Sequence, residues 1–151
     1  MEHELRQKAL KVLAGAATIL ILGTASGALQ IEPFYNVDTE IRIQGTVREI
    51  LFEVRYKGRS PFMVIALDEK DTGQKFRIDI SPSWFFDEDL HKGEKVEIVG
   101  SLVRSADDGK HVIAREVRLR GETLILRDTR GFPEWRGGGT ARGARRRGRN
   151  R

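Results

Sequence analysis

The residues with the clearest capacity for chemistry are five cations and one tyrosine near the middle of the chain. In order they are Arg55, Tyr56, Lys57, Arg59, Lys75 and Arg77. Cations beside an aromatic ring suit single-stranded nucleic acid, because bases stack on the ring while the cations neutralise phosphates. The same residues also fit an ordinary solvated hairpin. We therefore treat them as candidate ligand-binding residues on one face of a β-structure and its adjoining loop.

The strongest charge feature is the C-terminal segment, residues 136–151, which we call the basic tail. It has no acidic residue, and its seven arginines are Arg136, Arg142, Arg145, Arg146, Arg147, Arg149 and Arg151. No apolar residue larger than alanine is present, so the segment cannot build a core and we expect it to be disordered. Nucleic acid, anionic lipid headgroups and an acidic protein patch all fit its charge.

The charge of the remaining chain has the opposite sign. The whole chain has a formal net charge of +5, of which the basic tail carries +7 and residues 1–11 carry +1. Residues 12–135 therefore have a net charge of −3. A mildly acidic globular part weakens the case for nucleic-acid binding there, since phosphate binding needs a positive surface.

The other polar residues form no catalytic or metal-binding pattern. The absence of cysteine excludes disulfides, thiolate metal sites and cysteine catalysis. The histidines, His3, His91 and His111, are scattered, and we interpret them as surface residues without a functional role. Residues 87–89 are acidic and fit a solvated turn better than a cation site. We predict that the protein is not an enzyme and needs no metal or cofactor.

Residues 1–30, the leader, have the organisation of a targeting segment. Three basic residues in the first eleven positions precede an apolar run over residues 12–22, and small residues follow. This is the order of a secretory signal peptide. Residues 9–29 also approach the length of a retained membrane anchor, and a buried amphipathic helix is a third alternative. We expect an N-terminal hydrophobic helix and an exported, periplasmic or inner-membrane-anchored protein.

Between the leader and the basic tail, short segments alternate between apolar and polar residues, which is typical of β-strands. We expect strands over residues 41–54, 62–67, 75–80, 96–104, 111–119 and 123–126. The apolar parity of the first strand changes after Arg48, which predicts a β-bulge. Gly45 and Gly100 lie inside strands and indicate bends or the close approach of another backbone.

One short helix is expected between the third and fourth strands. Ser81-Pro82 resembles a helix start, with an N-cap residue followed by proline at the first helical position. Trp84, Phe85 and Leu90 would then plug the barrel. After the last strand, Phe132–Trp135 forms an aromatic clasp that we expect to fold back on the barrel.

Residues 38–128 resemble the bacterial OB-fold superfamily, and more closely its small exported or membrane-anchored domains. The residues that carry the resemblance are Gly45, Leu90, Gly93, Val96, Gly100, Ala114 and Val117. The resemblance implies a mainly β, five-stranded Greek-key barrel. Superfamily members commonly bind nucleic acid or oligosaccharide on strands two and three. Exported haem chaperones of this class need a histidine near the end of the barrel, and none follows His111 here.

These observations predict three parts: the leader (1–30) as signal peptide or membrane anchor, an OB-like barrel (31–135) and the basic tail (136–151). The predicted function is a non-enzymatic binding or accessory module, exported or membrane-tethered, whose tail attracts a polyanion. A protein partner or an anionic surface is the expected partner. The alternative is a single-stranded nucleic-acid-binding protein that uses barrel and tail together. Residues 9–29 would contact the membrane if the leader is not cleaved.

Overall fold

The computed structural model describes residues 34–55, 60–103 and 109–137, apart from the side chain of Arg55. These stretches belong to one unit, Glu32–Arg151. The leader with its predicted hydrophobic helix, and the basic tail beyond Gly137, lie outside the described residues. No helix within the described stretches is long and apolar enough to cross a membrane.

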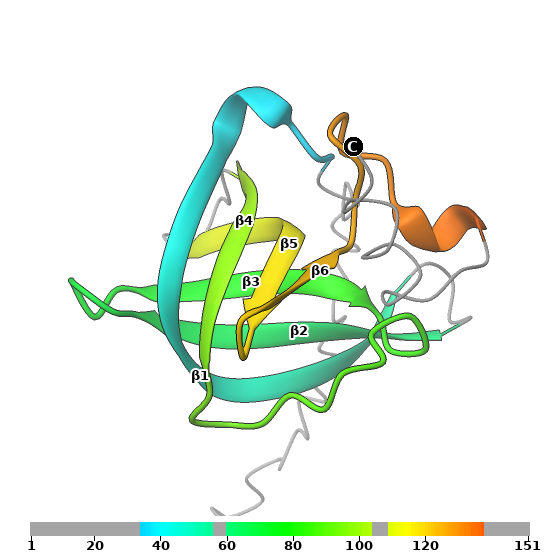
Figure 1. Cartoon of the computed structure of the whole chain (residues 1–151). Helices are drawn as coiled ribbons and strands as arrows, with labels where there is room; N and C mark the ends of the chain where they lie inside the picture. The colour runs from blue at the N-terminus through cyan, green and yellow to red at the C-terminus, as the bar shows by residue number, and fades with distance from the viewer. Residues whose placement is uncertain (1–33, 56–59, 104–108, 138–151) are drawn as a thin grey trace, which may run out of the picture. The chain divides into compact units, whose positions relative to one another are not determined.

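The described chain is mainly β-structure (Figure 1). In chain order its elements are η1 (Val37–Thr39), β1 (Glu40–Arg55), β2 (Ser60–Glu69), β3 (Lys75–Pro82), β4 (Lys95–Val103), β5 (Lys110–Leu119), β6 (Glu122–Ile125) and η3 (Glu134–Gly137). Each strand begins and ends within about two residues of its expected bounds, because alternation and turn residues are strong local signals.

The first five strands close into a barrel. They are ordered β3-β2-β1-β4-β5, and every neighbouring pair in this order is antiparallel. A parallel pairing of β3 with β5 closes the barrel, while β6 adds to β5 as an outer strand. The predicted mainly β, five-stranded barrel is therefore confirmed.

β1 takes part in two walls of the barrel. Its first half pairs with β4 and its second half with β2, and the register shifts between Val47 and Glu49. The predicted bulge at Arg48 is thus confirmed, and an extra residue at this point bends the strand so that it can serve both partners. A Cβ at Gly45 would lie 2.3 Å from the carbonyl oxygen of Asp68, so only glycine permits this approach of β2.

The predicted helix between β3 and β4 is wrong, because residues 83–94 form turns and irregular chain. Pro82 is instead the last residue of β3 and pairs with Phe62 of β2. The acidic residues 87–89 also oppose a helix that would end beside them, since the C-terminal end of a helix repels negative charge. Phe85 and Leu90 are buried as predicted, whereas Trp84 is half-exposed and Phe86 is buried in its place.

One apolar cluster fills the barrel. Strand alternation predicts six inward-facing residues, and five of them belong to this cluster: Ile43, Ile78, Val96, Ile98 and Val112. The sixth, Val64, is buried but lies outside this cluster. Its neighbours Met63 and Ile65 are members, so strand alternation directs Val64 to the other face of β2.

Candidate functional site

The structure places part of the predicted ligand-binding face. Arg77 on β3 contacts Glu53 on β1, with its Nη2 atom 2.5 Å from each carboxylate oxygen. Because Glu53 neutralises the positive charge of Arg77, Arg77 has less charge to offer to a bound phosphate. Lys75 is exposed at the start of β3. Tyr56, Lys57, Arg59 and the Arg55 side chain lie outside the described residues, so their binding role stays a prediction.

The basic tail is represented by its first two residues. Arg136 is exposed in η3. The other six arginines, Arg142, Arg145, Arg146, Arg147, Arg149 and Arg151, lie outside the described residues, so polyanion binding by the tail also stays a prediction.

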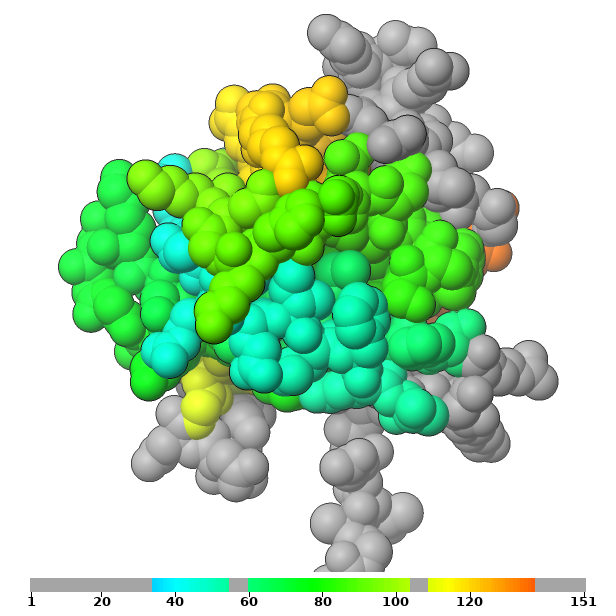
Figure 2. Space-filling model, turned by 90° about the horizontal axis from the view of Figure 1, so that it is seen from below, coloured from blue at the N-terminus to red at the C-terminus, as the bar shows by residue number. Residues whose placement is uncertain are grey.

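A second surface, which sequence reasoning missed, crosses the outer side of β1, β4 and β5. It is an open hollow of about 310 Å³, which we call the cationic groove. Its lining is Gln44, Gly45, Thr46, Lys70, Lys95, Val96, Glu97, Arg118, Arg120 and Gly121. Figure 2 shows the face of the molecule on which β1 and β4 lie beside the β2–β3 turn.

The sheet register brings these distant residues together. Glu97 on β4 is opposite Gln44 on β1 and opposite Arg118 on β5, while Lys95 is opposite Thr46. Residues opposite each other on neighbouring strands have side chains in reach of one another. The backbone N–H of Lys70 donates to the carbonyl oxygen of Gln44 at 2.8 Å, which brings the β2–β3 turn to the same place. The sequence shows polar alternation at these positions, but only the register reveals the cluster.

The single acidic residue of the groove is already neutralised. Glu97 accepts a hydrogen bond from Gln44 Nε2 at 2.8 Å on Oε2, and Arg42 contacts its Oε1. The hydrogen bond from Gln44 and the nearby guanidinium of Arg42 lower the pKa of Glu97 below its usual value. Glu97 therefore stays ionised and holds Arg42 and Gln44 in place.

Arg120 lines the groove too, but its guanidinium is already paired with other groups of the barrel. Its Nε atom lies 2.9 Å from Glu94 Oε1, and its Nη2 atom donates to the Asp89 carbonyl oxygen at 2.6 Å. Arg120 and Gly121 have φ values of 52° and 81°, as a tight β5–β6 turn requires. The positive φ is unfavourable for arginine, and the two contacts of its side chain offset that cost.

Three cations remain around the groove: Lys70, Lys95 and Arg118. None of them forms an ion pair within the described stretches. Arg118 lies close enough to Glu97 to help lower the pKa of that carboxyl. The groove thus has a positive charge on a barrel whose sequence is net acidic.

His111 is less exposed than its interpretation as a surface residue predicts. Its side chain is 15% exposed, and its Nε2 atom lies 2.9 Å from Oδ2 of Asp79, whose side chain is 4% exposed. The two atoms are at ion-pair distance but are not aligned for a hydrogen bond. The contact spans the parallel pairing of β3 with β5. No group of three or more metal-binding side chains occurs among the described residues.

The C-terminal segment packs on one end of the barrel, as expected for the aromatic clasp. The Trp135 ring makes edge contacts with Phe62 at 6.0 Å and with Phe85 at 5.7 Å between ring centres. The guanidinium of Arg127 lies over Trp135 at 4.7 Å and over Tyr35 at 5.8 Å. Arg127 therefore joins the N-terminal entry to the C-terminal exit of the described chain.

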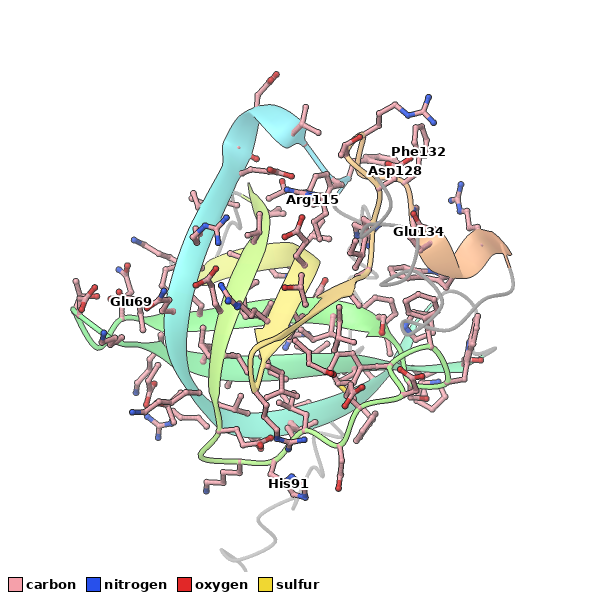
Figure 3. The ribbon with its side chains drawn as sticks, in the orientation of Figure 1. Glu69, His91, Arg115, Asp128, Phe132 and Glu134 are labelled. Carbon is pink, nitrogen blue, oxygen red and sulfur yellow. The ribbon has the colours of Figure 1, made fainter. Side chains whose placement is uncertain are left out.

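A charged cluster supports the same end. Arg115 binds Glu40 through two hydrogen bonds, at 2.6 and 3.2 Å, and the Tyr35 hydroxyl donates to Glu40. The hydrogen bonds from Arg115 lower the pKa of Glu40 against the opposing effect of burial. Burial, with the hydrogen bond to Glu40, raises the pKa of Tyr35. In Figure 3, Arg115 lies near Asp128 and Phe132 at this end.

By its architecture, the chain is a small closed β-barrel domain with a positively charged outer groove and an aromatic cover on one end. The model of the MamS/MamX magnetosome protein family matches residues 39–124, which is more than half of the chain. The chain therefore belongs to the MamS/MamX magnetosome protein family. No curated protein matches the chain.

The matched residues run from the end of η1 into β6, so the match covers all five barrel strands. Tyr35, Arg127 and the aromatic clasp lie outside it. The sequence resemblance pointed to the broad OB-fold superfamily, whereas the comparison identifies a magnetosome family. Membership of the OB-fold superfamily stays an interpretation.

Proposed function

We propose that this chain is a non-enzymatic accessory module of the magnetosome, exported or tethered to a membrane, in which an OB-like barrel offers a binding surface and the basic tail attracts a polyanion. The family match supports the accessory role and the association with the magnetosome. The polyanion favoured by the geometry is an anionic membrane surface.

The observation that carries this proposal is the stacking of Arg127 between Tyr35 and Trp135. Tyr35 is one residue from the start of the described chain, and Trp135 is two residues from the end of its last stretch. The entry and the exit of the barrel domain are therefore at one end of it, as Figure 1 also shows.

Exposed aromatic side chains occur at the same end. Phe34, next to Tyr35, is 85% exposed, and Phe132 is 56% exposed with the Arg130 guanidinium 5.3 Å from its ring centre. Aromatic rings and cations together are typical of protein surfaces that meet lipid headgroups. Only residues 30–33 separate residues 9–29 from Phe34, so a retained anchor would keep Phe34 near the headgroups by its short connection.

The test uses the full-length chain and vesicles of phosphatidylcholine with or without phosphatidylglycerol. In a neutral-tail variant, arginines 142, 145, 146, 147, 149 and 151 are replaced by glutamine. Because each arginine that neutralises a phosphate steepens the salt dependence of binding, we expect this variant to lose most of its salt-dependent affinity for anionic vesicles. A control variant with lysine at the same six positions should keep it. Undiminished vesicle binding by the neutral-tail variant would contradict the proposal.

The same proteins distinguish the nucleic-acid alternative. Under our proposal, the neutral-tail variant should have little affinity for single-stranded DNA. Adding Tyr56→Ala to this variant should hardly change that affinity. If the neutral-tail variant instead binds single-stranded DNA and Tyr56→Ala weakens that binding by roughly 1–3 kcal/mol through lost stacking, the nucleic-acid function replaces ours.

A further inference from the structure

We propose that the cationic groove is a binding site for a phosphate-class oxyanion, separate from the basic tail. The site rests on described residues of the barrel alone and does not depend on the membrane role proposed above. Its cations are Lys70 from the β2–β3 turn, Lys95 from β4 and Arg118 from β5.

The first argument is the local charge. Four cationic residues line the groove and only one acidic residue does. Arg42, from outside the lining, is bound to that acid, Glu97. Arg120 is bound to Glu94. With both acids compensated by arginines, the positive charges of Lys70, Lys95 and Arg118 remain.

The second argument is that the sheet register and a backbone hydrogen bond bring these cations to the same part of the surface. Lys95 and Arg118 are on adjacent strands, each facing the same side as Glu97, and Lys70 is brought to β1 by its backbone hydrogen bond. Arg118 lies directly opposite Glu97 and diagonally across from Lys95. A multiply charged anion beside these cations would accept charge-assisted hydrogen bonds from lysine ammonium and arginine guanidinium groups.

The third argument concerns size and chemistry. A hollow of about 310 Å³ is at the lower end of the range for small-ligand sites, which is roughly 300–1,000 Å³. It is therefore large enough to hold a small anionic group. Arginine binds phosphate oxygens through two parallel N–H groups, and lysine adds a point charge. A phosphate group, either free or as the headgroup of a lipid, offers oxygen acceptors that match these donors.

The test is a titration of the full-length neutral-tail variant with pyrophosphate, in which isothermal titration calorimetry measures the affinity. In this background the tail contributes no arginine beyond Arg136. The groove pair Lys95→Gln with Arg118→Gln should weaken binding at least tenfold. The control pair Lys92→Gln with Lys110→Gln removes the same charge from exposed positions outside the groove and should change affinity less than twofold.

A second variant gives a change in the opposite direction, which misfolding cannot produce. Glu97→Gln removes the one acidic side chain from the groove and frees Arg42, so it should bind pyrophosphate several-fold more tightly. Arg118→Lys keeps the charge but loses the paired N–H groups, and its affinity should lie between those of the parent and the groove pair. Equal weakening by the groove and control pairs, or no saturable binding in the parent, would overturn the site.

Two probes separate the sources of the phosphate. Vesicles containing phosphatidylglycerol are titrated with the neutral-tail variant, with and without the groove substitutions. A further loss of vesicle binding that is specific to the groove pair identifies a lipid headgroup as the occupant. An effect on pyrophosphate alone identifies a free phosphate compound. Either result supports the site, and the tail experiment above can fail independently of it.

Discussion

The guanidinium of Arg127 lies 4.7 Å from the ring centre of Trp135, and this contact holds the C-terminal segment on the barrel. Arg127 is 7% exposed and also donates to the carbonyl oxygen of Gly131 at 3.4 Å. On its other side is Tyr35, whose ring fills the space that a side chain at Gly131 would need. These contacts join chain segments that are far apart in the sequence.

We expect Arg127→Met to destabilise the domain by about 1–3 kcal/mol, because it keeps the packing volume but removes two cation–π contacts in a desolvated position. Chemical denaturation followed by tryptophan fluorescence measures the change. Arg130→Met is the matched control, since Arg130 is exposed over Phe132. Equal effects of both substitutions would show that the buried stack stabilises the domain no more than the exposed contact does.

Ile98→Ala should cost on the order of 2–4 kcal/mol in unfolding free energy, because Ile98 is completely buried in the barrel core and the cavity is only partly refilled. Val54→Ala provides the comparison, since Val54 is 77% exposed. Thermal and denaturant unfolding midpoints measure both. A negligible change for Ile98→Ala would mean that the inward parity of β4 is incorrect.

The pKa of Glu40 is lowered in the folded protein, so its ionised form is favoured by folding. The resulting stabilisation is present above the ordinary glutamate pKa, about 4.5, and is lost as the pH falls through the lower folded value. Glu40→Gln should therefore be less stable than the parent at neutral pH, and its stability should decline less on acidification.

Denaturation midpoints at neutral pH and at about pH 3 measure this difference. Asp38→Asn is the control, since Asp38 is an exposed carboxyl of η1 that forms no ion pair within the described part of the chain. If Glu40→Gln and the parent lose equal stability on acidification, the ion pair of Glu40 with Arg115 is not the source of the acid sensitivity.

Residues 1–35, fused to a reporter that is active only after export, should give an active reporter, because a basic stretch, an apolar run and small residues occur in the order of a secretory signal. Replacement of Leu20 and Leu22 by arginine interrupts the apolar run and should abolish export. Activity that survives this change, or a reporter confined to the cytoplasm, contradicts the predicted location.

Much of the barrel could be predicted from sequence because its signals are local. The bulge at Arg48 follows from the change of parity in β1, and the positive φ of Gly73 and Gly93 follows from their turns. The helix between β3 and β4 failed for a non-local reason: Pro82 pairs with Phe62, which offers strand contacts that outweigh a local helix-start pattern.

The candidate site was less predictable. Arg77 looked like a free cation on an outward strand position, and only the folded structure shows Glu53 against it. The cationic groove combines Lys70, Lys95 and Arg118, which are widely separated along the chain. Single outward-facing cations are common on strands, so no local pattern distinguishes those that share a surface.

The parallel pairing of β3 with β5 has a consequence for the time course of folding. It joins Phe76 to Lys110, which are 34 positions apart (110 − 76). The first half of β1 likewise cannot pair until β4 is present, since Glu40 pairs with Ser101. Contacts at such sequence separations make folding slow, on the millisecond to second scale of β-barrels. The barrel therefore closes only after β5 is available. If the chain is exported as we propose, this topology would delay closure of the barrel until nearly all of the strands have crossed the membrane.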